Sequence, residues 1–444
     1  MSEATWKYVR LGDIAKTSSG GTPSRGKPAF YNGTIPFVKS GELGDRVVYE
    51  TEEAITKEAL ASSSAKLFPK GTLCIALYGA TVGKLGILGM DAATNQAVCG
   101  IFPPDELDTK FLYRFFESKR RELIEQGKGG AQSNISQGII RDTVIPLPSL
   151  KEQHDIVAEI EKQFTRLEAG VAALKRVQAN LKRYRAGVLK AACEGKLVPT
   201  EAELARAEGR KYETGAQLLE RILTERRKNW QGRGKYKEPT AVENLTELPN
   251  GWLWATIDQL GELGTGATPK RGTASYYEGG KIPWVTSAAL NKEYVDEAYE
   301  FVTERALAET NLTIFPPGTL LVAMYGEGKT RGKCAELRIS ATTNQAIAGI
   351  ICSADIRSYL KLCIWRQYEE LRLTASGGVQ PNLNLSLVRA INIPLPPLAE
   401  QKRIVEEVER RLSVLEEMET AVQANLLRAA RLRQAVLQRA FRGG

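Results

Sequence analysis

IPLPSLKEQHDIVAEIE, from Ile145 to Glu161, returns with small changes as IPLPPLAEQKRIVEEVE, from Ile393 to Glu409. In both copies a short apolar run broken by two prolines leads at once into a charged, periodic stretch. The second copy begins 248 residues after the first, in a chain of 444 residues. A segment repeated at this distance indicates a molecule built in two halves.

Five further blocks repeat in the same order in the two halves. They pair Gly20–Leu43 with Gly266–Leu290, Phe68–Lys84 with Phe315–Lys333, Ala93–Ile101 with Thr342–Ile350, Gly129–Ser136 with Gly377–Asn384, and Arg185–Leu197 with Arg433–Gly444. The offset between partners stays nearly constant, which chance does not produce. The sequence therefore predicts an internal duplication that extends over most of the chain.

The first part of each half is rich in turns. Its short apolar runs, such as IPFV and TLCIALY, are bounded by Gly, Pro and Asn, which indicates strands, and one helical stretch follows in each copy. The predicted class is therefore α+β. The predicted domains are residues 1–148 and 251–396 as two globular domains, 149–197 and 397–444 as two helical regions, and 198–250 as a linker with a short helix.

The second part of each half repeats apolar residues every seven positions. The repeated positions are Ile160, Leu167, Leu174, Leu181 and Val188 in the first copy, and Val408, Leu415, Val422, Ala429 and Val436 in the second. Sustained heptads with charged residues elsewhere predict a coiled coil, about 60 Å long at ~1.5 Å per residue. We expect the two helices to pair antiparallel within one chain, giving a pseudo-two-fold molecule. The alternative is that each helix docks on its own globular domain.

Composition narrows the class of protein. Lys and Arg number 61 against 52 Asp and Glu, a net charge of +9 and a pI near 9.1, which favours a polyanionic partner, although a lysine-rich surface would also explain it. The six cysteines form no C-x-x-C pair and are expected to be reduced thiols. No long apolar run occurs, so we expect a soluble, cytoplasmic protein.

Motifs for catalysis are missing from the sequence. The glycine-rich stretch Tyr78–Lys84 has the wrong spacing for a nucleotide-binding P-loop. We expect it to approach a nucleic-acid backbone through main-chain N–H groups, and the alternative is a plain hairpin turn. The single histidine, His154, is replaced by Lys402 in the second copy. The chain has no zinc or calcium motif, and no Asn/Asp-Pro-Pro-aromatic tetrapeptide of the kind that amino-methyltransferases use. We therefore expect a binding protein with no cofactor and no metal of its own.

Polar residues that can contact DNA bases or phosphates gather in the repeated loops. The candidates in the first copy are Arg25, Lys27, Lys39, Ser40, Tyr78, Gly79, Lys84, Gln132 and Asn134. Those in the second copy are Lys270, Arg271, Thr286, Ser287, Tyr325, Lys329, Arg331, Lys333, Gln380 and Asn382. The repeated Asn-Gln pair, Asn95–Gln96 and Asn344–Gln345, could read bases or could form a buried turn.

These blocks together resemble the specificity subunit of type I restriction-modification enzymes. The resemblance rests on the GGTPS-like turn, IPW/FV, the TNQA block, IPLP-x-L-x-EQ opening a long helix, and RAGVLKAACEGKL closing it, all written twice. It covers essentially the whole chain. The second copy departs at its end, where FRGG stops short of the KLVP that follows Gly195 in the first copy.

The resemblance implies two target recognition domains, each reading half of a bipartite DNA site, and an antiparallel coiled coil that acts as a ruler. It also implies that the chain is not catalytic and that its partners are double-stranded DNA, two modification (methyltransferase) subunits and restriction/translocase subunits. S-adenosylmethionine is expected on the methyltransferase partner, which methylates adenine. Two rival interpretations are a two-headed tether without DNA specificity and an enzyme with duplicated domains.

Overall fold

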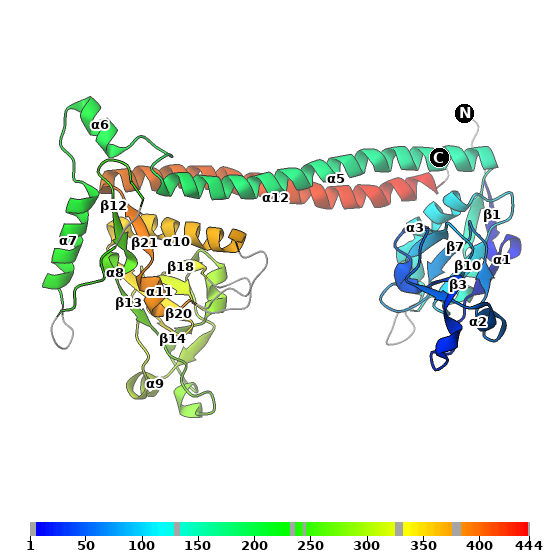
Figure 1. The fold of residues 1–444 in the computed structure, drawn as a ribbon, viewed down its shortest axis with the longest axis horizontal. Helices are drawn as coiled ribbons and strands as arrows, with labels where there is room; N and C mark the ends of the chain where they lie inside the picture. Colours follow the sequence, from blue (N-terminus) through cyan, green and yellow to red (C-terminus); the bar gives the residue numbers. More distant parts are fainter. Residues whose placement is uncertain are drawn as a thin grey trace. The chain divides into compact units, whose positions relative to one another are not determined.

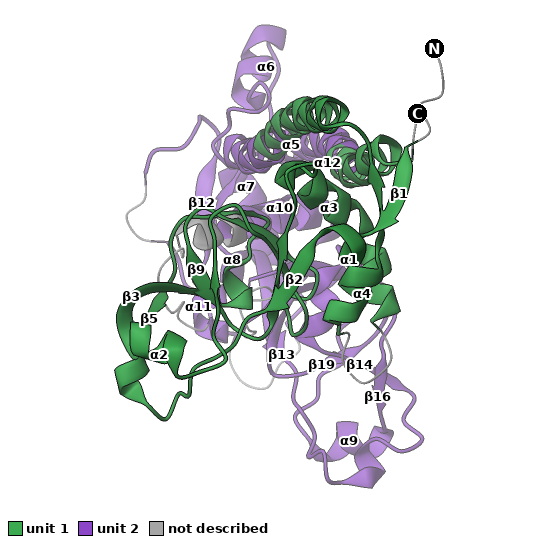
Figure 2. Ribbon diagram, turned by 90° about the vertical axis from the view of Figure 1, so that its right-hand side faces the viewer, with its two compact units in different colours: residues 1–176, 422–444 green, residues 177–421 purple. Residues whose placement is uncertain are grey.

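The computed structural model describes residues 6–127, 134–230, 236–242, 246–324, 332–374 and 383–442, the side chains of 368–374 excepted. The chain divides into two compact units (Figure 2). Unit 1 comprises residues 1–176 and 422–444, and unit 2 comprises residues 177–421. Each unit therefore contains one globular head together with the beginning of one long helix and the end of the other.

The head of unit 1 is built from three sheets (Figure 1). The five-stranded sheet has the order β2 (Lys16–Ser19), β10 (Val98–Phe102), β7 (Leu73–Ala76), β8 (Leu85–Leu88) and β4 (Arg46–Val48). The four-stranded sheet has the order β5 (Glu53–Ile55), β3 (Tyr31–Val38), β9 (Ala92–Thr94) and β6 (Leu67–Phe68). The two-stranded ribbon pairs β1 (Lys7–Arg10) with β11 (Val144–Leu147).

Short helices and turns complete this head. They are α1 (Leu11–Ile14), η1 (Pro28–Phe30), η2 (Ser40–Glu42), α2 (Lys57–Ala61), α3 (Thr109–Gln126) and α4 (Gln137–Asp142). Helix α3 begins where the Asp108 carboxylate accepts a hydrogen bond from the Phe111 N–H at 2.8 Å. Its buried face, including Phe111 and Leu112, packs against Leu73 and Ile101 of the five-stranded sheet and forms the core of the head.

The head of unit 2 repeats this plan. Its five-stranded sheet has the order β13 (Gly261–Thr265), β20 (Ile347–Cys352), β17 (Leu320–Ala323), β18 (Cys334–Leu337) and β15 (Tyr294–Val295). The smaller sheet has the order β16 (Glu300–Val302), β14 (Ile282–Val285) and β19 (Thr342–Thr343), and the ribbon pairs β12 (Leu253–Thr256) with β21 (Asn392–Leu395). The remaining elements are α8 (Ile257–Leu260), η3 (Ala274–Tyr276), η4 (Ser287–Asn291), α9 (Glu304–Glu309), α10 (Ala354–Thr374) and α11 (Leu385–Arg389).

One glycine in each main sheet shows why the two heads pack alike. A Cβ atom on Gly100 would lie 2.6 Å from the ring of Phe68, and one on Gly349 would lie 2.5 Å from the ring of Phe315. Both phenylalanines are buried. Strands β10 and β20 therefore need glycine at this position because an aromatic ring lies directly against their backbone.

The repeated IPLP-x-L-x-EQ segment joins each head to a long helix. Its apolar run forms β11 or β21, the second strand of the ribbon, and the long helix begins three residues after the ribbon ends. The buried amide of Gln153 donates to the Pro148 carbonyl at 2.9 Å and accepts from the Asp108 N–H at 2.7 Å. Gln401 makes the equivalent bond to the Pro396 carbonyl, also at 2.9 Å. The repeated glutamine thus fixes the helix start by satisfying backbone groups there.

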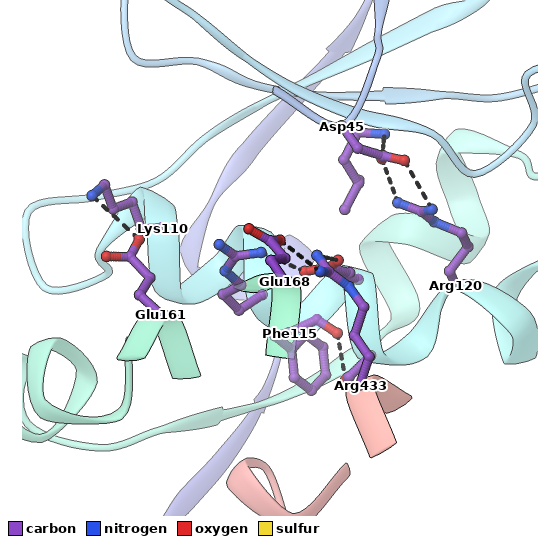
Figure 3. A network of polar contacts seen from close by, with 11 residues as sticks. Asp45, Lys110, Phe115, Arg120, Glu161, Glu168 and Arg433 are labelled. Carbon is purple, nitrogen blue, oxygen red and sulfur yellow. Dashed lines mark hydrogen bonds and ion pairs between the residues drawn. The ribbon is translucent and has the colours of Figure 1, made fainter. Parts of the chain in front are cut away.

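The two long helices are α5 (Leu150–Cys193) and α12 (Leu398–Ala440). In unit 1 the first part of α5 contacts the last part of α12, where Arg433 stacks over the Phe164 ring at 3.9 Å. Arg433 also pairs with Glu168 at 3.1 Å (Figure 3). In unit 2 the last part of α5 contacts the first part of α12, through Arg185 and Glu416 at 3.8 Å. In both units the beginning of one long helix contacts the end of the other, so the two helices run antiparallel.

The predicted fold class is therefore confirmed: two α+β domains and two long helices that form an antiparallel coiled coil within one chain. Among the predicted heptad residues, Ile160, Leu181, Val188, Val408, Leu415, Val422 and Ala429 are buried, whereas Leu167, Leu174 and Val436 are partly buried. The heptad count missed Phe164, Leu189, Leu412 and Leu437, which are also buried.

The segment between the halves contains two helices rather than the one expected, α6 (Glu201–Glu208) and α7 (Gly215–Lys228). Thr200 and Glu203 form a reciprocal capping box at the start of α6. The same helix start is held to α12, because the buried Glu400 carboxylate accepts from the Glu201 N–H at 2.8 Å and from the Trp252 indole at 3.0 Å. Within the described part of the chain, no helix is both long enough and apolar enough to cross a bilayer.

Candidate nucleic-acid interface

The first repeated loop of each head is held in one fixed conformation. A Cβ atom on Gly20 would lie 2.1 Å from the Thr94 hydroxyl, and one on Gly266 would lie 1.7 Å from the Thr343 carbonyl oxygen. Only glycine allows the loop to lie this close to the turn formed by Thr94–Gln96 in the first head and by Thr343–Gln345 in the second, called the TNQ turn below. The two segments are also joined by side chains, because the Thr22 hydroxyl bonds to Gln96 and the Thr268 hydroxyl bonds to Gln345.

A tyrosine supports the far side of this loop in each head. The Tyr31 hydroxyl donates to the Pro23 carbonyl at 2.6 Å, and the Tyr277 hydroxyl donates to the Pro269 carbonyl at 2.5 Å. The two bonds are equivalent, since Thr-Pro occupies the same place in both loops. Each loop is therefore anchored at both ends and presents its intervening residues to solvent.

One arginine in each loop lies over this tyrosine. The guanidinium of Arg25 is 4.5 Å from the centroid of the Tyr31 ring. That of Arg271 is 5.1 Å from the Tyr277 ring and 4.8 Å from the Trp284 ring. The partners make Arg25 and Arg271 equivalent residues, and both side chains are exposed. Cation–π stacking gives each guanidinium a defined direction.

A carboxylate holds each of these arginines. Arg25 pairs with Glu53 at 2.8 Å, and Arg271 pairs with Glu300. The hydrogen bond to Glu53 raises the pKa of Arg25, and the bond from Arg25 lowers the pKa of Glu53. Hydrogen bonding to Glu300 likewise raises the pKa of Arg271. Both arginines are thus charged and already paired in the protein alone.

Lys39 joins the same cluster in the first head. Its ammonium group lies 2.7 Å from Glu52 and 3.2 Å from Glu53, and these two hydrogen bonds raise its pKa. The second copy has Thr286 at this position, so the cluster there contains one cation fewer. A surface hollow of about 490 Å³ adjoins the Arg271–Glu300 pair, and Tyr277 lines it as well.

Other predicted residues of these loops are placed as follows. Lys27 is exposed, with its ammonium group 5.0 Å from the centroid of the Phe30 ring, and Lys270 is exposed beside Arg271. Ser40 and Ser287 are partly buried at the first positions of η2 and η4, and Thr286 precedes η4. Their backbones form turns.

The glycine-rich loop between β7 and β8 forms a hairpin turn, which was the alternative interpretation of Tyr78–Lys84. The Gly83 N–H bonds to the Ala76 carbonyl at 2.8 Å, and Gly79 and Gly83 both have positive φ angles, of 84° and 75°. Tyr78 and Gly79 are exposed at its tip, and Lys84 is partly buried. The chain near Asn134, which is exposed, lies beside this loop, because the Ile135 N–H bonds to the Leu77 carbonyl at 2.7 Å.

In the second head, Lys333 donates to the Asn291 side chain at 2.7 Å, which places it next to η4. Six predicted contacts lie outside the described residues or side chains. They are Gln132, Tyr325, Lys329, Arg331, Gln380 and Asn382. Which of the described candidates contact bases or phosphates stays a prediction.

The repeated Asn-Gln pair forms a turn, and whether it also reads bases stays a prediction. The Asn95 N–H bonds to the Val38 carbonyl, and the Asn344 N–H bonds to the Val285 carbonyl, both at 3.1 Å, so the backbone forms a turn against the neighbouring strand. The side chains of Gln96 and Gln345 are nevertheless exposed. The turn therefore carries a polar side chain to the surface beside the arginine loop.

Sequence reasoning missed the two glutamates of the clusters. A signal for them existed, since EAITKEALA from Glu53 to Ala61 matches EFVTERALA from Glu300 to Ala308. The threonines of this block cap α2 and α9, where Thr56 and Thr303 accept from the Ala59 and Ala306 N–H groups at 3.2 Å. The two glutamates begin β5 and β16, far along the chain from the arginine loops, so only the fold brings each carboxylate to its arginine.

The comparisons with known proteins agree with this architecture. Residues 3–175 and 249–426 match the family model described as the type I restriction modification DNA specificity domain. The MjaIX specificity subunit of Methanocaldococcus jannaschii is 24% identical over 88% of this chain and 83% of its own length. The EcoDI specificity subunit of Escherichia coli is 24% identical over 99% of this chain and 88% of its own length.

Solved structures support the fold. One, titled for complex assembly and conformational transition of the type I R-M system, matches with a TM-score of 0.64 at 19% identity, covering 99% of this chain and 98% of that chain. The class of protein is thus defined by two duplicated α+β heads, each joined to one of two long helices. The chain belongs to the family of type I restriction-modification DNA specificity proteins.

Proposed function

We propose that this chain is the DNA specificity subunit of a type I restriction-modification complex, in which each head reads one half of a bipartite target. The observation that carries the proposal is the duplicated arginine loop, which both heads hold by the same glycine, threonine, tyrosine and glutamate contacts. Two copies of one cationic surface suit a ligand with two equivalent segments, and double-stranded DNA has this property.

The chain itself carries no catalytic role in this proposal. It acts with two methyltransferase subunits, which bind S-adenosylmethionine and methylate adenine, and with restriction/translocase subunits. It needs no cofactor of its own. The cytoplasmic location expected from the sequence stays a prediction.

The two long helices contribute a ruler. Helices α5 and α12 are each continuous and each belong to both compact units. A continuous helix has a length fixed by its number of residues, so the helices set the gap between the two half-sites. This role is part of the proposal.

The test is to express the chain with its methyltransferase partner and to map methylated adenines in the host DNA. A bipartite motif with a constant gap is expected. Inserting one helical turn into both α5 and α12 should then change the gap and leave both half-sites the same. Methylation without a bipartite motif would reject the function, and an unchanged gap in a folded insertion variant would reject the ruler.

A further inference from the structure

The arginines of the duplicated loops are exposed yet already paired. The side chains of Arg25 and Arg271 are 56% and 57% accessible, and the carboxylates that hold them, Glu53 and Glu300, are 28% and 39% accessible. A basic surface that binds an anionic polymer gains from free cations. A glutamate at the same place in both heads instead lowers the positive charge where DNA is expected to bind.

The two glutamates are placed by rigid elements. Glu53 is the first residue of β5 and pairs with Phe37 of β3, while Glu300 is the first residue of β16 and pairs with Trp284 of β14. The arginines lie on loops that lean on the aromatic rings of the same sheets. The strand therefore fixes the carboxylate, and the carboxylate draws the loop arginine toward the sheet.

Such a pair competes with DNA for the guanidinium. A phosphate that takes the arginine must break its bond to the glutamate. Lys270 forms no ion pair with any residue that the structure describes, so it has no such bond to lose. Contact with random DNA, which offers phosphates but not the matching base edges, then gains little from Arg25 or Arg271. A correct half-site, which offers the matching base edges in addition, can compensate for the broken pair.

We infer, resting on the proposed function, that Glu53 and Glu300 are specificity-determining residues that suppress binding to non-specific DNA by holding Arg25 and Arg271. They act through the arginines and are thus positioning residues. The first head has a second cation at this place, because Glu53 also binds Lys39, although Glu52 holds Lys39 at a shorter distance, and the matching residue of the second head is the uncharged Thr286.

The experiment compares Glu53→Gln and Glu300→Gln with the natural chain, each in complex with the methyltransferase partner. Binding is measured between about 50 and 200 mM salt, on a duplex that carries the mapped motif and on a scrambled duplex of equal length. The slope of log affinity against log salt on the scrambled duplex should steepen by about 0.9 for Glu300→Gln, and by a similar amount for Glu53→Gln, since Glu52 still holds Lys39 there. The ratio of motif to scrambled affinity should fall several-fold.

Glu213→Gln is the matched control. Glu213 binds Arg221 of α7 through two hydrogen bonds of 3.0 and 3.2 Å, so its substitution also releases an arginine and also raises the net charge by one. It lies in the segment between the halves. The inference requires that this control leave the scrambled-duplex slope nearly unchanged.

The double variant Glu300→Gln with Arg271→Ala separates release of the arginine from loss of structure. It should restore the slope of the natural chain, because the released cation is gone. A slope that stays steep in the double variant, or a Glu300→Gln slope equal to that of the control, overturns the inference. If the natural chain itself prefers neither duplex, the proposed function fails instead.

Discussion

The two helix ends, one in each compact unit, dock on equivalent helices with different side chains. In unit 1, Phe441 at the end of α12 makes edge contacts with Phe111 and Phe115 of α3, at centroid distances of 5.3 and 5.5 Å. In unit 2, Cys193 at the end of α5 meets Cys363 of α10, with 3.5 Å between the sulfur atoms. These residues correspond at the repeat distance of 248.

The ion pairs above these contacts correspond at the same distance. Arg433 with Glu168 in unit 1 matches Arg185 with Glu416 in unit 2. In unit 1, however, Arg433 also binds Glu117, whose side chain is only 10% accessible, and Trp365 stands at the corresponding position of unit 2. The backbone frame was kept in both units, while the side chains that fill it diverged. Position is thus set by the duplication, and the strength of each contact by local chemistry.

The largest expected difference between the units concerns the helix ends. Phe441→Ala should lower the free energy of unfolding by about 3 kcal/mol, since it removes a large buried ring and leaves a cavity. Cys193→Ala should cost only about 1 kcal/mol, because a thiol contributes much less buried area. Denaturant unfolding followed by circular dichroism measures both. Equal losses would mean that the two ends do not differ as their packing indicates.

The loop glycines should behave alike in the two heads. Gly266→Ala and Gly20→Ala should each destabilise by about 2 kcal/mol, because the new Cβ would overlap the TNQ turn. Gly272→Ala in the same loop is the control, since a Cβ atom added there would have no neighbouring atom within 4 Å, and it should change stability by less than about 0.5 kcal/mol. Thermal unfolding separates the two classes, and a control as damaging as Gly266→Ala would contradict the close approach.

The equivalent arginines of the long helices should differ moderately. Arg433→Ala should cost about 1 kcal/mol because it leaves the nearly buried Glu117 without this partner. Arg185→Ala should cost under about 0.5 kcal/mol, since both of its partners are more exposed and lie at 3.6 and 3.8 Å. The difference should shrink if Arg433→Ala is combined with Glu117→Gln. If it does not shrink, the loss at Arg433 comes from packing on Phe164.

The smallest effects are expected at the DNA loops. Lys270→Ala should weaken binding to scrambled DNA by less than about tenfold and lower the salt slope by about 0.9, as loss of one phosphate contact requires. Arg271→Ala should lower that slope less, because Glu300 already neutralises the arginine. Filter binding over a salt series measures both slopes. An equal drop for the two variants would mean that Glu300 does not restrain Arg271.

Much of the fold could be predicted because the duplication repeats the same motifs at a nearly constant distance along the chain. The IPLP repeats located both helix starts, and the heptads marked one line of each helix. The count by sevens passed over Phe164, Leu189, Leu412 and Leu437 because they lie off that line: Phe164 and Leu412 come four positions, and Leu189 and Leu437 one position, after a counted residue. The DNA candidates could be chosen by residue type, but their partners could not.

The sequence by itself determined that the chain has two similar halves, that each is an α+β head followed by a long helix, and that arginine and lysine occur in matched loops. These properties depend on local spacing, turn residues and periodicity. Only the tertiary structure decided that Glu53 and Glu300 hold the loop arginines, and that each helix end docks beside the start of the other helix. Those contacts join residues far apart in the chain, and strand register and side-chain direction, rather than sequence distance, bring their charges together.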